Sequence, residues 1–594
     1  MSILSELRRR NVFRVAAVYA IAGWVLLQVA ELLFGALGVP GWSLRLVLGL
    51  LLLGLPLALI FSWVYELTPE GLKREHEVER NESITRQTAR KINLLIAVLL
   101  AVAIGLGLFG WFNGRGERAR AVAPSVSAPS TTPVSGAALA ASIAVLPFVN
   151  MSADQANEYF SDGLSEELLN VLAKVPDLKV IARTSSFAYK GKEVKISDIA
   201  RELQVANVLE GSVRKSGDRV RITAQLIRAS DSTHLWSETY DRTINDIFAL
   251  QDEIAGQVVD ALKLELLGDA KPSVDVGGTQ NPAAYEAYLR GKFEFNKGFT
   301  ETNARAALAA YDLAVELDPS FAVAQAARAR MTLALAMNGY MPFDEGFAQA
   351  RVVALRAIDL APNLSDGHIA LAGVQASAEL DWPGAEGSLR TALRLNPSDP
   401  DGYRALADLT TSLGRHEEAI AAARKAVSLD PLSADRLGRL GYVLFAARRY
   451  DEARVSIRQA AALAPGRPGQ HYVVGLVSLA EGDPASAVEA CAQEVIEWER
   501  QTCLAIAYDK LGRRADSDAH YAQLKRESGD SSAYQYAEIH AQRGEIDEAL
   551  KWLTVARKVR DPGLSNSKVD LFLDPLRKDA RFEALMRELG LSEA

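Results

Sequence analysis

The residues of this chain that could do chemistry do not form familiar catalytic patterns. The sequence has no G-x-x-x-x-G-K-[ST] phosphate loop, no H-E-x-x-H zinc motif, no G-x-S-x-G nucleophile and no C-x-x-C pair. Its seven histidines are scattered, and no two share metal-ligand spacing on one predicted helix. We therefore expect a protein that is not an enzyme, with no cofactor and no metal site.

Acidic residues gather around one predicted helix that starts after residue 150. The loop 150–163 could bind an anion at the helix start, whereas Asp154 or Asp162 there is more typical of a cap on a helix turn. Glu166 and Glu167 are more typical of a solvated helix face than of a catalytic carboxylate pair. We therefore expect no acid–base chemistry from these groups.

The two cysteines of the chain, Cys491 and Cys503, fall on predicted helices that neighbour each other in the C-terminal region. In an oxidising compartment this placement allows a disulfide between them. Alternatively, both are small core residues. The sequence leaves these two interpretations open.

The C-terminal region carries a repeat that would position such residues. Small residues and a proline recur with spacings of 4, 3 and 5, first at Ala307, Tyr311, Ala314 and Pro319. The pattern returns four times, and its later prolines are Pro362, Pro397, Pro431 and Pro465. A period near 34 residues is the signature of tetratricopeptide repeats, which are stacked helix pairs. With weaker copies further on, we expect about eight repeats and a cap over residues 283–594.

The first helices of such repeats line a concave face that usually binds an extended peptide or another protein's segment. Repeat alignment places five candidate protein-binding residues on this face: Arg404, Asp408, Tyr442, Phe445 and Tyr472. The alternative interpretation is that the aromatic residues only complete packing between repeats, and that the charged residues are solvated. Protein or peptide partners are therefore expected for these repeats.

Three apolar segments predict a membrane domain over residues 1–112. They cover about 15–37, 46–65 and 92–112, and each reaches the roughly 20 residues that a helix needs to cross a bilayer. Lys and Arg are concentrated on one side of these segments, which predicts a cytoplasmic amino-terminus. The pattern predicts a multi-pass protein of the bacterial inner membrane, in contact with the lipid bilayer, with its C-terminal domains in the periplasm.

A small α/β domain is expected between this region and the repeats. Residues 113–141 are rich in Pro, Ser and Ala and predict a flexible linker. Over 142–268, alternating strand and helix patterns give the order βαβαβββα, and a second linker covers 269–282. The expected fold class is multi-domain: three transmembrane helices, this α/β domain, and an all-α tetratricopeptide-repeat superhelix.

The α/β segment carries a family resemblance. The stretches "IAVLPFVNMS…YFSDGLSEELLNVLAKVPDLKVIARTSSFAYKG" and "VLEGSVRKSGDRVRITAQLIRASDSTHLWSETYDR" resemble the domain that is similar to the amino-terminal domain of the periplasmic protein TolB. In bacterial relatives this domain follows a winged-helix domain, a cyclase domain or membrane spans, and precedes tetratricopeptide repeats. The resemblance implies a membrane-anchored architecture and no particular activity.

Two functional hypotheses follow from these features. The net charge of −8 argues against a nucleic-acid partner, whose binding surface would be strongly basic. The first hypothesis is a non-enzymatic, membrane-anchored scaffold that binds protein partners through its repeat groove on the periplasmic side. The alternative is a membrane sensor or signal transducer whose periplasmic domains detect a ligand or partner. The oligomeric state is left open.

Overall fold

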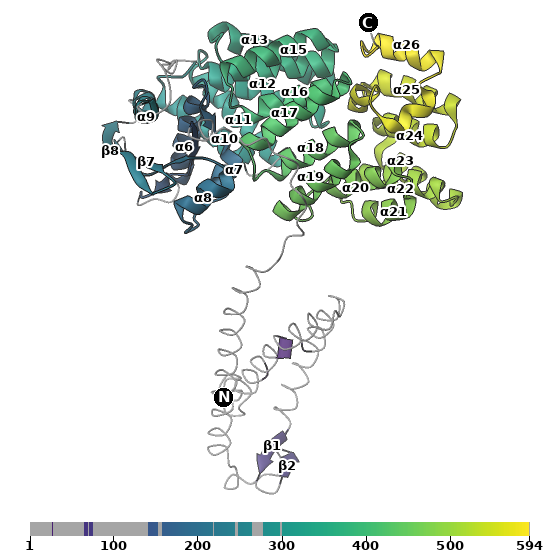
Figure 1. The fold of residues 1–594 in the computed structure, drawn as a ribbon, viewed down its shortest axis with the longest axis horizontal. Coiled ribbons are helices and arrows are strands. Elements are labelled where there is room, and N and C mark those ends of the chain that lie inside the picture. Colours follow the sequence, from purple (N-terminus) through teal and green to yellow (C-terminus); the bar gives the residue numbers. More distant parts are fainter. Residues whose placement is uncertain are drawn as a thin grey trace. The chain divides into compact units, whose positions relative to one another are not determined.

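The computed structural model describes most of the chain beyond residue 140. The described residues are 141–152, 157–217, 219–243, 247–263, 277–296 and 300–592, together with 19, 26, 27, 51, 65–68 and 71–74. The chain divides into two compact units, residues 1–132 and residues 133–594. In the second unit, an α/β domain precedes a long series of helices (Figure 1).

The described part of the first unit contains a short hairpin. Strands β1 (Tyr65–Thr68) and β2 (Gly71–Arg74) pair antiparallel, so Tyr65, the predicted end of the second membrane span, belongs to a strand. No helix among the described residues has the length and apolar character needed to cross a membrane. This finding corrects the predicted fold class, with its three transmembrane helices, and the predicted multi-pass inner-membrane location. Almost all of the segments 15–37, 46–65 and 92–112 lie outside the described residues.

The α/β domain is built on a mixed sheet with the strand order β5-β3-β6-β7-β8, and β4 also pairs with β6. Strand β3 is parallel to β5 and β6, whereas β6, β7 and β8 form an antiparallel meander. The elements are β3 (Ser142–Val145), β4 (Val149–Asn150), α6 (Glu158–Ala173), β5 (Lys179–Val180), α7 (Arg183–Phe187), α8 (Ile196–Leu203), β6 (Asn207–Ser216), β7 (Arg219–Arg228), β8 (Thr233–Thr243) and α9 (Ile247–Lys263). The expected single first strand is divided into β3 and β4 around Pro147, which has no N–H to donate to a sheet.

Helices cover both faces of the sheet at strand β3. Ile143 and Val145 pack in the same core as α6 and α9, while Ala144 and Leu146 pack with α8 on the other face. Successive side chains of a strand point to opposite faces, so a strand covered on both faces is apolar throughout. Strand β7 follows the predicted alternation instead, and its inward residues are fully buried: Val220, Ile222, Ala224 and Leu226.

The remainder of the second unit is a curved stack of helix pairs. The helices are α10 (Pro282–Asn296), α11 (Glu301–Leu317), α12 (Ala322–Met337), α13 (Phe343–Leu360), α14 (Ser365–Val374), α15 (Trp382–Leu395), α16 (Pro400–Ser412), α17 (His416–Leu429), α18 (Ala434–Ala446), α19 (Tyr450–Leu463), α20 (Gln470–Ala480), α21 (Pro484–Cys491), α22 (Glu497–Lys510), α23 (Arg514–Ser528), α24 (Ala533–Gln542), α25 (Ile546–Val559) and α26 (Ala580–Glu588). The short helical segments η4 (Gln375–Glu379), η5 (Gly529–Ser532), η6 (Pro562–Asn566) and η7 (Leu571–Leu576) lie between them.

The repeat pattern read from the sequence matches the helix boundaries. Each of the five predicted prolines lies two residues beyond the end of a second helix; Pro319, for example, follows α11, which ends at Leu317. The small residues at the repeat positions are buried between helices, and Ala307 and Ala314 are 0% exposed. Small side chains let paired helices approach closely, which is why the pattern recurs.

The α/β domain is packed against the repeats through backbone and side-chain hydrogen bonds. The Ser185 hydroxyl donates to Asp430 Oδ1 at 2.6 Å, and the Ser185 N–H donates to the same oxygen at 3.1 Å. The Ala182 N–H donates to the Leu429 carbonyl at 2.7 Å. Asp430 is 1% exposed, so this contact is part of the protein interior. The repeats and the α/β domain therefore share one core rather than being joined only by the chain.

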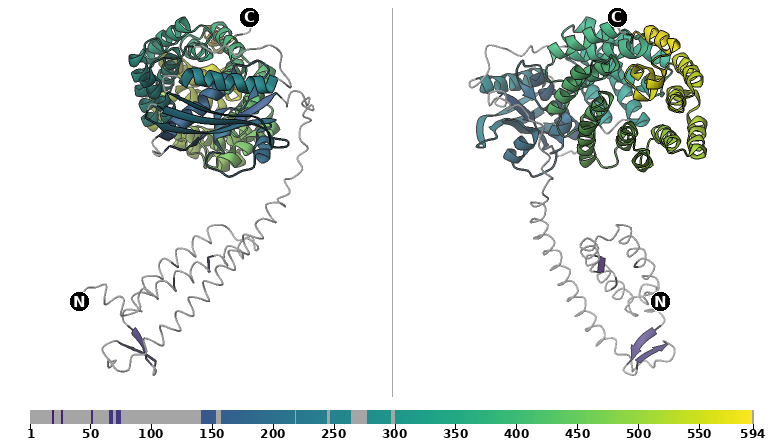
Figure 2. Two further views of the ribbon diagram at one scale, coloured as in Figure 1. Left: turned by 90° about the vertical axis from the view of Figure 1, so that its left-hand side faces the viewer. Right: turned by 45° about the vertical axis from the view of Figure 1, so that its right-hand side comes forward.

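The superhelix also turns back on itself, so that its C-terminal end packs against α15. The Trp382 indole N–H donates to the Leu589 carbonyl at 2.7 Å across 207 residues of sequence. Trp382, Leu589 and Leu591 belong to the same hydrophobic core. In the right-hand view of Figure 2, the yellow C-terminal helices curve back toward the teal helices at the start of the repeats. The concave face is therefore enclosed rather than open.

Candidate protein-binding cavity

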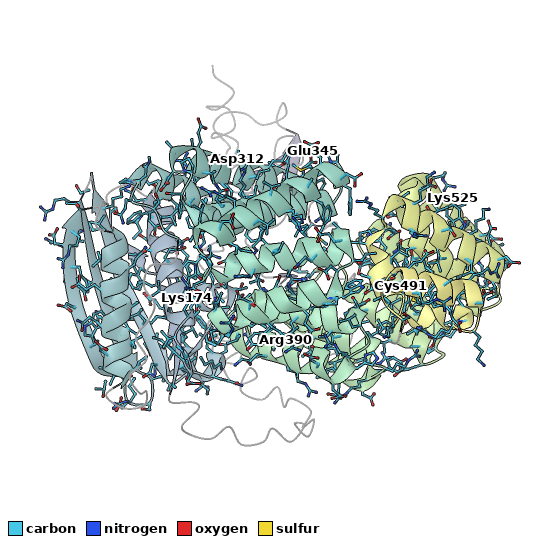
Figure 3. All side chains as sticks on the ribbon, turned by 90° about the horizontal axis from the view of Figure 1, so that it is seen from above. Lys174, Asp312, Glu345, Arg390, Cys491 and Lys525 are labelled. Carbon is cyan, nitrogen blue, oxygen red and sulfur yellow. A yellow bond between two sulfur atoms is a disulfide. The ribbon has the colours of Figure 1, made fainter. Side chains whose placement is uncertain are left out.

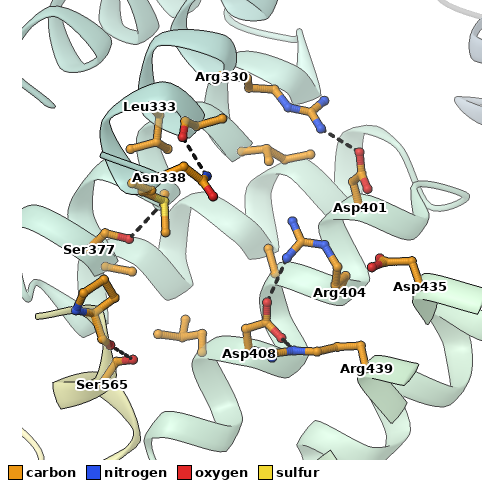
Figure 4. A pocket seen from close by; sticks show the side chains of 18 of the residues that line it. Arg330, Leu333, Asn338, Ser377, Asp401, Arg404, Asp408, Asp435, Arg439 and Ser565 are labelled. Carbon is orange, nitrogen blue, oxygen red and sulfur yellow. Dashed lines mark hydrogen bonds and ion pairs between the residues drawn. The ribbon is translucent and has the colours of Figure 1, made fainter. Parts of the chain in front are cut away.

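The concave face of the superhelix surrounds a cavity of about 2360 Å³. Its lining comes mainly from helix α6 of the α/β domain and from the first helix of each pair, α10 to α24 in even numbers, with single residues from second helices such as α13 and α15. The segments around η6 and η7 line it from the opposite side, where Ser565 lies (Figure 4). The cavity is therefore a property of the whole assembled stack rather than of a single repeat.

A ladder of charged side chains crosses the middle of the cavity. Arg330, Asp366, Asp401 and Arg436 come from α12, α14, α16 and α18, with sequence separations of 36, 35 and 35 residues. Arg330 donates to Asp366 at 2.9 Å and to Asp401 at 2.6 Å, as the upper part of Figure 4 shows for Asp401. Arg436 also pairs with Asp401. We name this set the central ladder.

The central ladder keeps its shared carboxylate ionised. Burial alone would raise the pKa of Asp401, but Arg330 and Arg436 outweigh that effect and hold the pKa well below its usual range. Each rung therefore contains opposite charges within hydrogen-bonding distance. This arrangement fixes the relative position of neighbouring repeats.

A second row of charges contains two of the predicted binding residues. Arg404 donates to Asp408 at 2.8 Å, and Arg439 pairs with the other oxygen of the same carboxylate (Figure 4). The guanidinium of Arg439 also lies 4.9 Å from the centre of the Tyr442 ring. A cation at this distance from an aromatic face is attracted by the ring.

The structure places all five predicted binding residues at the cavity: Arg404, Asp408, Tyr442, Phe445 and Tyr472. Phe445 is only 6% exposed and packs 6.1 Å from Tyr450, measured between ring centres, so part of its role is packing within its helix pair. Tyr472 contacts Trp498 edge to face at 5.8 Å. Their role in binding a partner stays a prediction.

Carboxyl groups gather at the C-terminal end of the cavity. Glu499 comes from α22, Glu538 from α24, and Asp570 from the residue before η7. The Tyr534 hydroxyl donates to Asp570 Oδ2 at 2.8 Å, and the Phe572 N–H donates to Oδ1 at 2.8 Å. We name Glu499, Glu538, Asp561 and Asp570 the acidic end.

The environment of the acidic end favours protonated carboxyl groups. Burial and the neighbouring charge of Asp570 raise the pKa of Glu538 well above its usual range, and burial raises the pKa of Asp570. Burial and the charge of Glu494 raise the pKa of Glu499 to about 8.

The acidic residues of α6 occupy a different environment from the one predicted. Lys292 of α10 pairs with Glu166 at 3.0 Å and with Glu167 at 2.7 Å, and all three side chains are at most 16% exposed. Glu166 and Glu167 therefore do not form a solvated face, because the α/β domain covers them by docking on α10. Asp162 pairs with Lys190 at 2.6 Å, and Asp154 lies outside the described residues.

The two cysteines are joined by a disulfide in this structure. Both are 0% exposed, and the bond links α21 to α22, that is, one repeat to the next. Figure 3 shows Cys491 in the C-terminal half of the stack. Gly475 of α20 packs directly on the two sulfur atoms, and a Cβ atom at this position would overlap with Cys491 Sγ.

Sequence reasoning missed the central ladder and the acidic end for different reasons. The ladder had a partial signal, because Asp366 and Asp401 both stand four residues after a repeat proline, and Arg436 stands five residues after the next one. The acidic end has no such signal. Asp561 and Asp570 lie in irregular segments after the last regular helix pair, and only the closure of the superhelix brings them beside Glu538.

Comparison with known protein families assigns the repeats. Residues 373–434 and 439–501 match the family model of a tetratricopeptide repeat. The C-terminal region contains tetratricopeptide repeats. Residues 139–257 match the model of the second domain of HilA/YgeH-like transcriptional regulators. Neither family model is that of the TolB domain, so the resemblance predicted from the sequence is not shown by these matches.

Among curated proteins, a protein named putative adenylate cyclase 3 of Rhizobium meliloti (strain 1021) is 40% identical over 237 residues. The match covers 39% of this chain and 39% of that protein, so the chain spans about two fifths of the length of the curated relative it matches.

Two solved structures illustrate the likeness to known helical-repeat folds. Pseudomonas aeruginosa PilF is 18% identical, with a TM-score of 0.28, over 34% of this chain and 91% of that one. The human IFIT1 dimer with m7Gppp-AAAA is 14% identical, with a TM-score of 0.36, over 53% and 81% of the two chains. Both likenesses concern the fold alone.

Proposed function

We propose that the protein is a non-enzymatic scaffold that binds a segment of a protein partner inside its repeat cavity. The observation that carries this proposal is the cavity of about 2360 Å³ lined by the first helices of successive repeats. Tetratricopeptide repeats generally mediate protein–protein interaction through this face. The paired charges of the central ladder support the proposal because they hold the cavity walls in place without a ligand.

Site-specific photo-cross-linking tests the proposal. The cross-linker p-benzoylphenylalanine replaces Tyr472 inside the cavity or, as the control, Arg390, which is exposed on helix α15 outside the cavity (Figure 3). We expect a partner segment, identified by mass spectrometry, to be linked from position 472 and not from position 390. Equal labelling from both positions, or none from 472, would contradict the proposal.

A double substitution then tests the predicted residues themselves. The cross-linked segment, made as a synthetic peptide, should bind the Arg404→Ala/Tyr442→Ala protein at least about tenfold more weakly than the unmodified protein. Circular dichroism should show unchanged helicity. The matched control, Arg390→Ala, should bind the peptide with unchanged affinity.

A second candidate function is a sensor or signal transducer. It is supported by the names of the matched proteins, a transcriptional-regulator domain for residues 139–257 and a putative adenylate cyclase over 237 residues. In this case the repeats and the α/β domain would receive a signal that another protein carries further. A full-length sample incubated with ATP and either Mg²⁺ or Mn²⁺ separates the non-enzymatic proposal from cyclase activity. We expect no cyclic AMP above a protein-free blank, and its formation would refute the non-enzymatic assignment.

A further inference from the structure

The middle of the cavity and its C-terminal end differ in how their charges are satisfied. In the central ladder, each carboxylate has an arginine partner within hydrogen-bonding distance. At the acidic end, none of the four carboxyl groups forms an ion pair with a Lys, Arg or His side chain of the described residues: Glu499, Glu538, Asp561 and Asp570. The cavity therefore has an excess of potential negative charge on one side.

Glu538 supplies a second and independent observation. The residue lines the cavity and is only 6% exposed. Its Oε2 atom is buried, and no N–H or O–H group of the described residues donates to it. A buried acceptor without a donor is costly, because it has lost its hydrogen bonds to water and has gained none in return. This oxygen belongs to a residue of the cavity wall and lacks a donor among the described residues.

Aromatic rings complete the walls around these carboxyl groups. Tyr442, Tyr472, Trp498 and Tyr534 all line the same part of the cavity. Burial, together with the charges of Glu538 and Asp570, raises the pKa of the Tyr442, Tyr472 and Tyr534 hydroxyl groups. Carboxylates combined with aromatic faces form the kind of site that binds an ammonium or guanidinium group.

A bare metal ion suits this site less well than an organic cation. Among the described residues, no group of three or more His, Cys, Asp or Glu side chains is arranged to hold a metal ion. Aromatic faces attract the diffuse charge of an organic cation, whereas a bare metal ion needs several oxygen or nitrogen ligands at once.

We propose that the acidic end of the cavity binds the Lys or Arg side chain of the partner segment. This inference rests on the proposed function, because it assigns a chemistry to the segment bound in the same cavity. The positive charge of the cation offsets the negative charges of Glu538 and Asp570, and its N–H groups give Glu538 Oε2 a donor. A neutral or acidic segment gains neither effect, so basic segments are selected.

Peptides of matched length test this proposal with the full-length protein. The probe is a fluorescent Gly-Ser-Lys-Gly-Lys-Ser peptide with blocked ends, and the comparison is the same peptide with both lysines acetylated. Fluorescence anisotropy should show that acetylation weakens binding by about tenfold or more. Equal affinity for the two peptides, or no binding of the lysine peptide, would overturn the proposal.

Isosteric variants then locate the contact. Glu538→Gln and Asp570→Asn keep the side-chain shape and should each weaken binding of the lysine peptide by about tenfold. The control Glu548→Gln removes a carboxylate from the exposed face of the adjacent helix α25 and should leave the affinity unchanged. Equal losses in all three variants would indicate attraction by net charge alone and would refute the site.

These outcomes can be separated from failure of the scaffold proposal. Photo-cross-linking from position 472 reports any bound segment, whatever its charge. If a segment without Lys or Arg is linked there and its affinity is unaffected by Glu538→Gln, the cation site is refuted and the scaffold stands.

Discussion

The middle of the cavity and its C-terminal end are lined by charged residues of similar type, yet the two regions use them differently. In the middle, Arg330, Asp401 and Arg436 come from the first helices of three repeats and satisfy one another. At the end, Glu538 and Asp570 come from a regular helix and an irregular segment, and no arginine or lysine of the described residues pairs with them. Charges that pair across the first helices stabilise the wall, whereas the carboxyl groups at the end lack a cationic partner among the described residues.

The largest change in stability is expected when the carboxylate shared by the central ladder is removed. Asp401→Ala removes two ion pairs of a partly buried site, but Arg330 keeps Asp366 and Arg436 keeps Asp435, so the cost is about 2 kcal/mol. We expect a free energy of unfolding lower by that amount, measured by urea denaturation followed by circular dichroism. The control is Asp435→Ala, whose side chain is 53% exposed and should cost less than about 1 kcal/mol. Equal losses in both variants would show that the ladder is not structural.

Glu499 tests the opposite region through the pH dependence of stability. Its pKa is raised from 4.5 to about 8 by burial and by the charge of Glu494, against the effect of Arg467. The folded state therefore holds this proton more tightly than the unfolded state. The stabilisation is complete below about pH 4.5 and is lost as the pH rises toward 8. At pH 9, Glu499 therefore stabilises the fold less than at pH 4.

The substitution Glu499→Gln removes this loss of stability at high pH, because glutamine does not ionise. We expect the variant to be more stable than the unmodified protein by about 1 kcal/mol at pH 9, a value reduced from the full linkage because Glu499 is only partly buried. At pH 4 the two proteins should have equal urea midpoints. The control Glu497→Gln on the same helix should show the opposite sign, because hydrogen bonds from Gln501 and Arg500 outweigh burial and lower the pKa of Glu497. A stability gain for Glu497→Gln at pH 9 would contradict this account.

The sequence predicted the regular part of the fold well. The proline and alanine spacing gave helix ends such as that of α11, because helix packing and helix termination are local effects that repeat. The alternation of Val220 to Leu226 likewise predicted one buried face of strand β7. The three predicted membrane helices were wrong for the described residues, where Tyr65 belongs to a hairpin. Apolar length alone did not establish a spanning helix.

The candidate site was predicted only in part, because its remaining features depend on long-range contacts. Repeat alignment placed Arg404 and Tyr442 on the concave face, because the position of a residue within its repeat determines which face of the helix it occupies. It did not report that Trp382 and Leu589 would meet across 207 residues and enclose the cavity. It also did not report that α6 would bring Glu166 and Glu167 onto Lys292. Both features follow from tertiary packing that no local pattern encodes.

The smallest change in stability is expected for Arg404. It tests directly whether the second row of charges supports the wall as the central ladder does. Arg404→Ala removes a partly exposed ion pair, but Asp408 keeps its second partner, Arg439. We therefore expect a change in the free energy of unfolding of less than about 0.5 kcal/mol, measured with the same urea titration. A loss above about 2 kcal/mol would mean that the second row supports the wall as the central ladder does. With a small loss, weaker peptide binding by the Arg404→Ala/Tyr442→Ala protein reports lost contacts rather than lost structure, because the row that fixes the repeats is untouched.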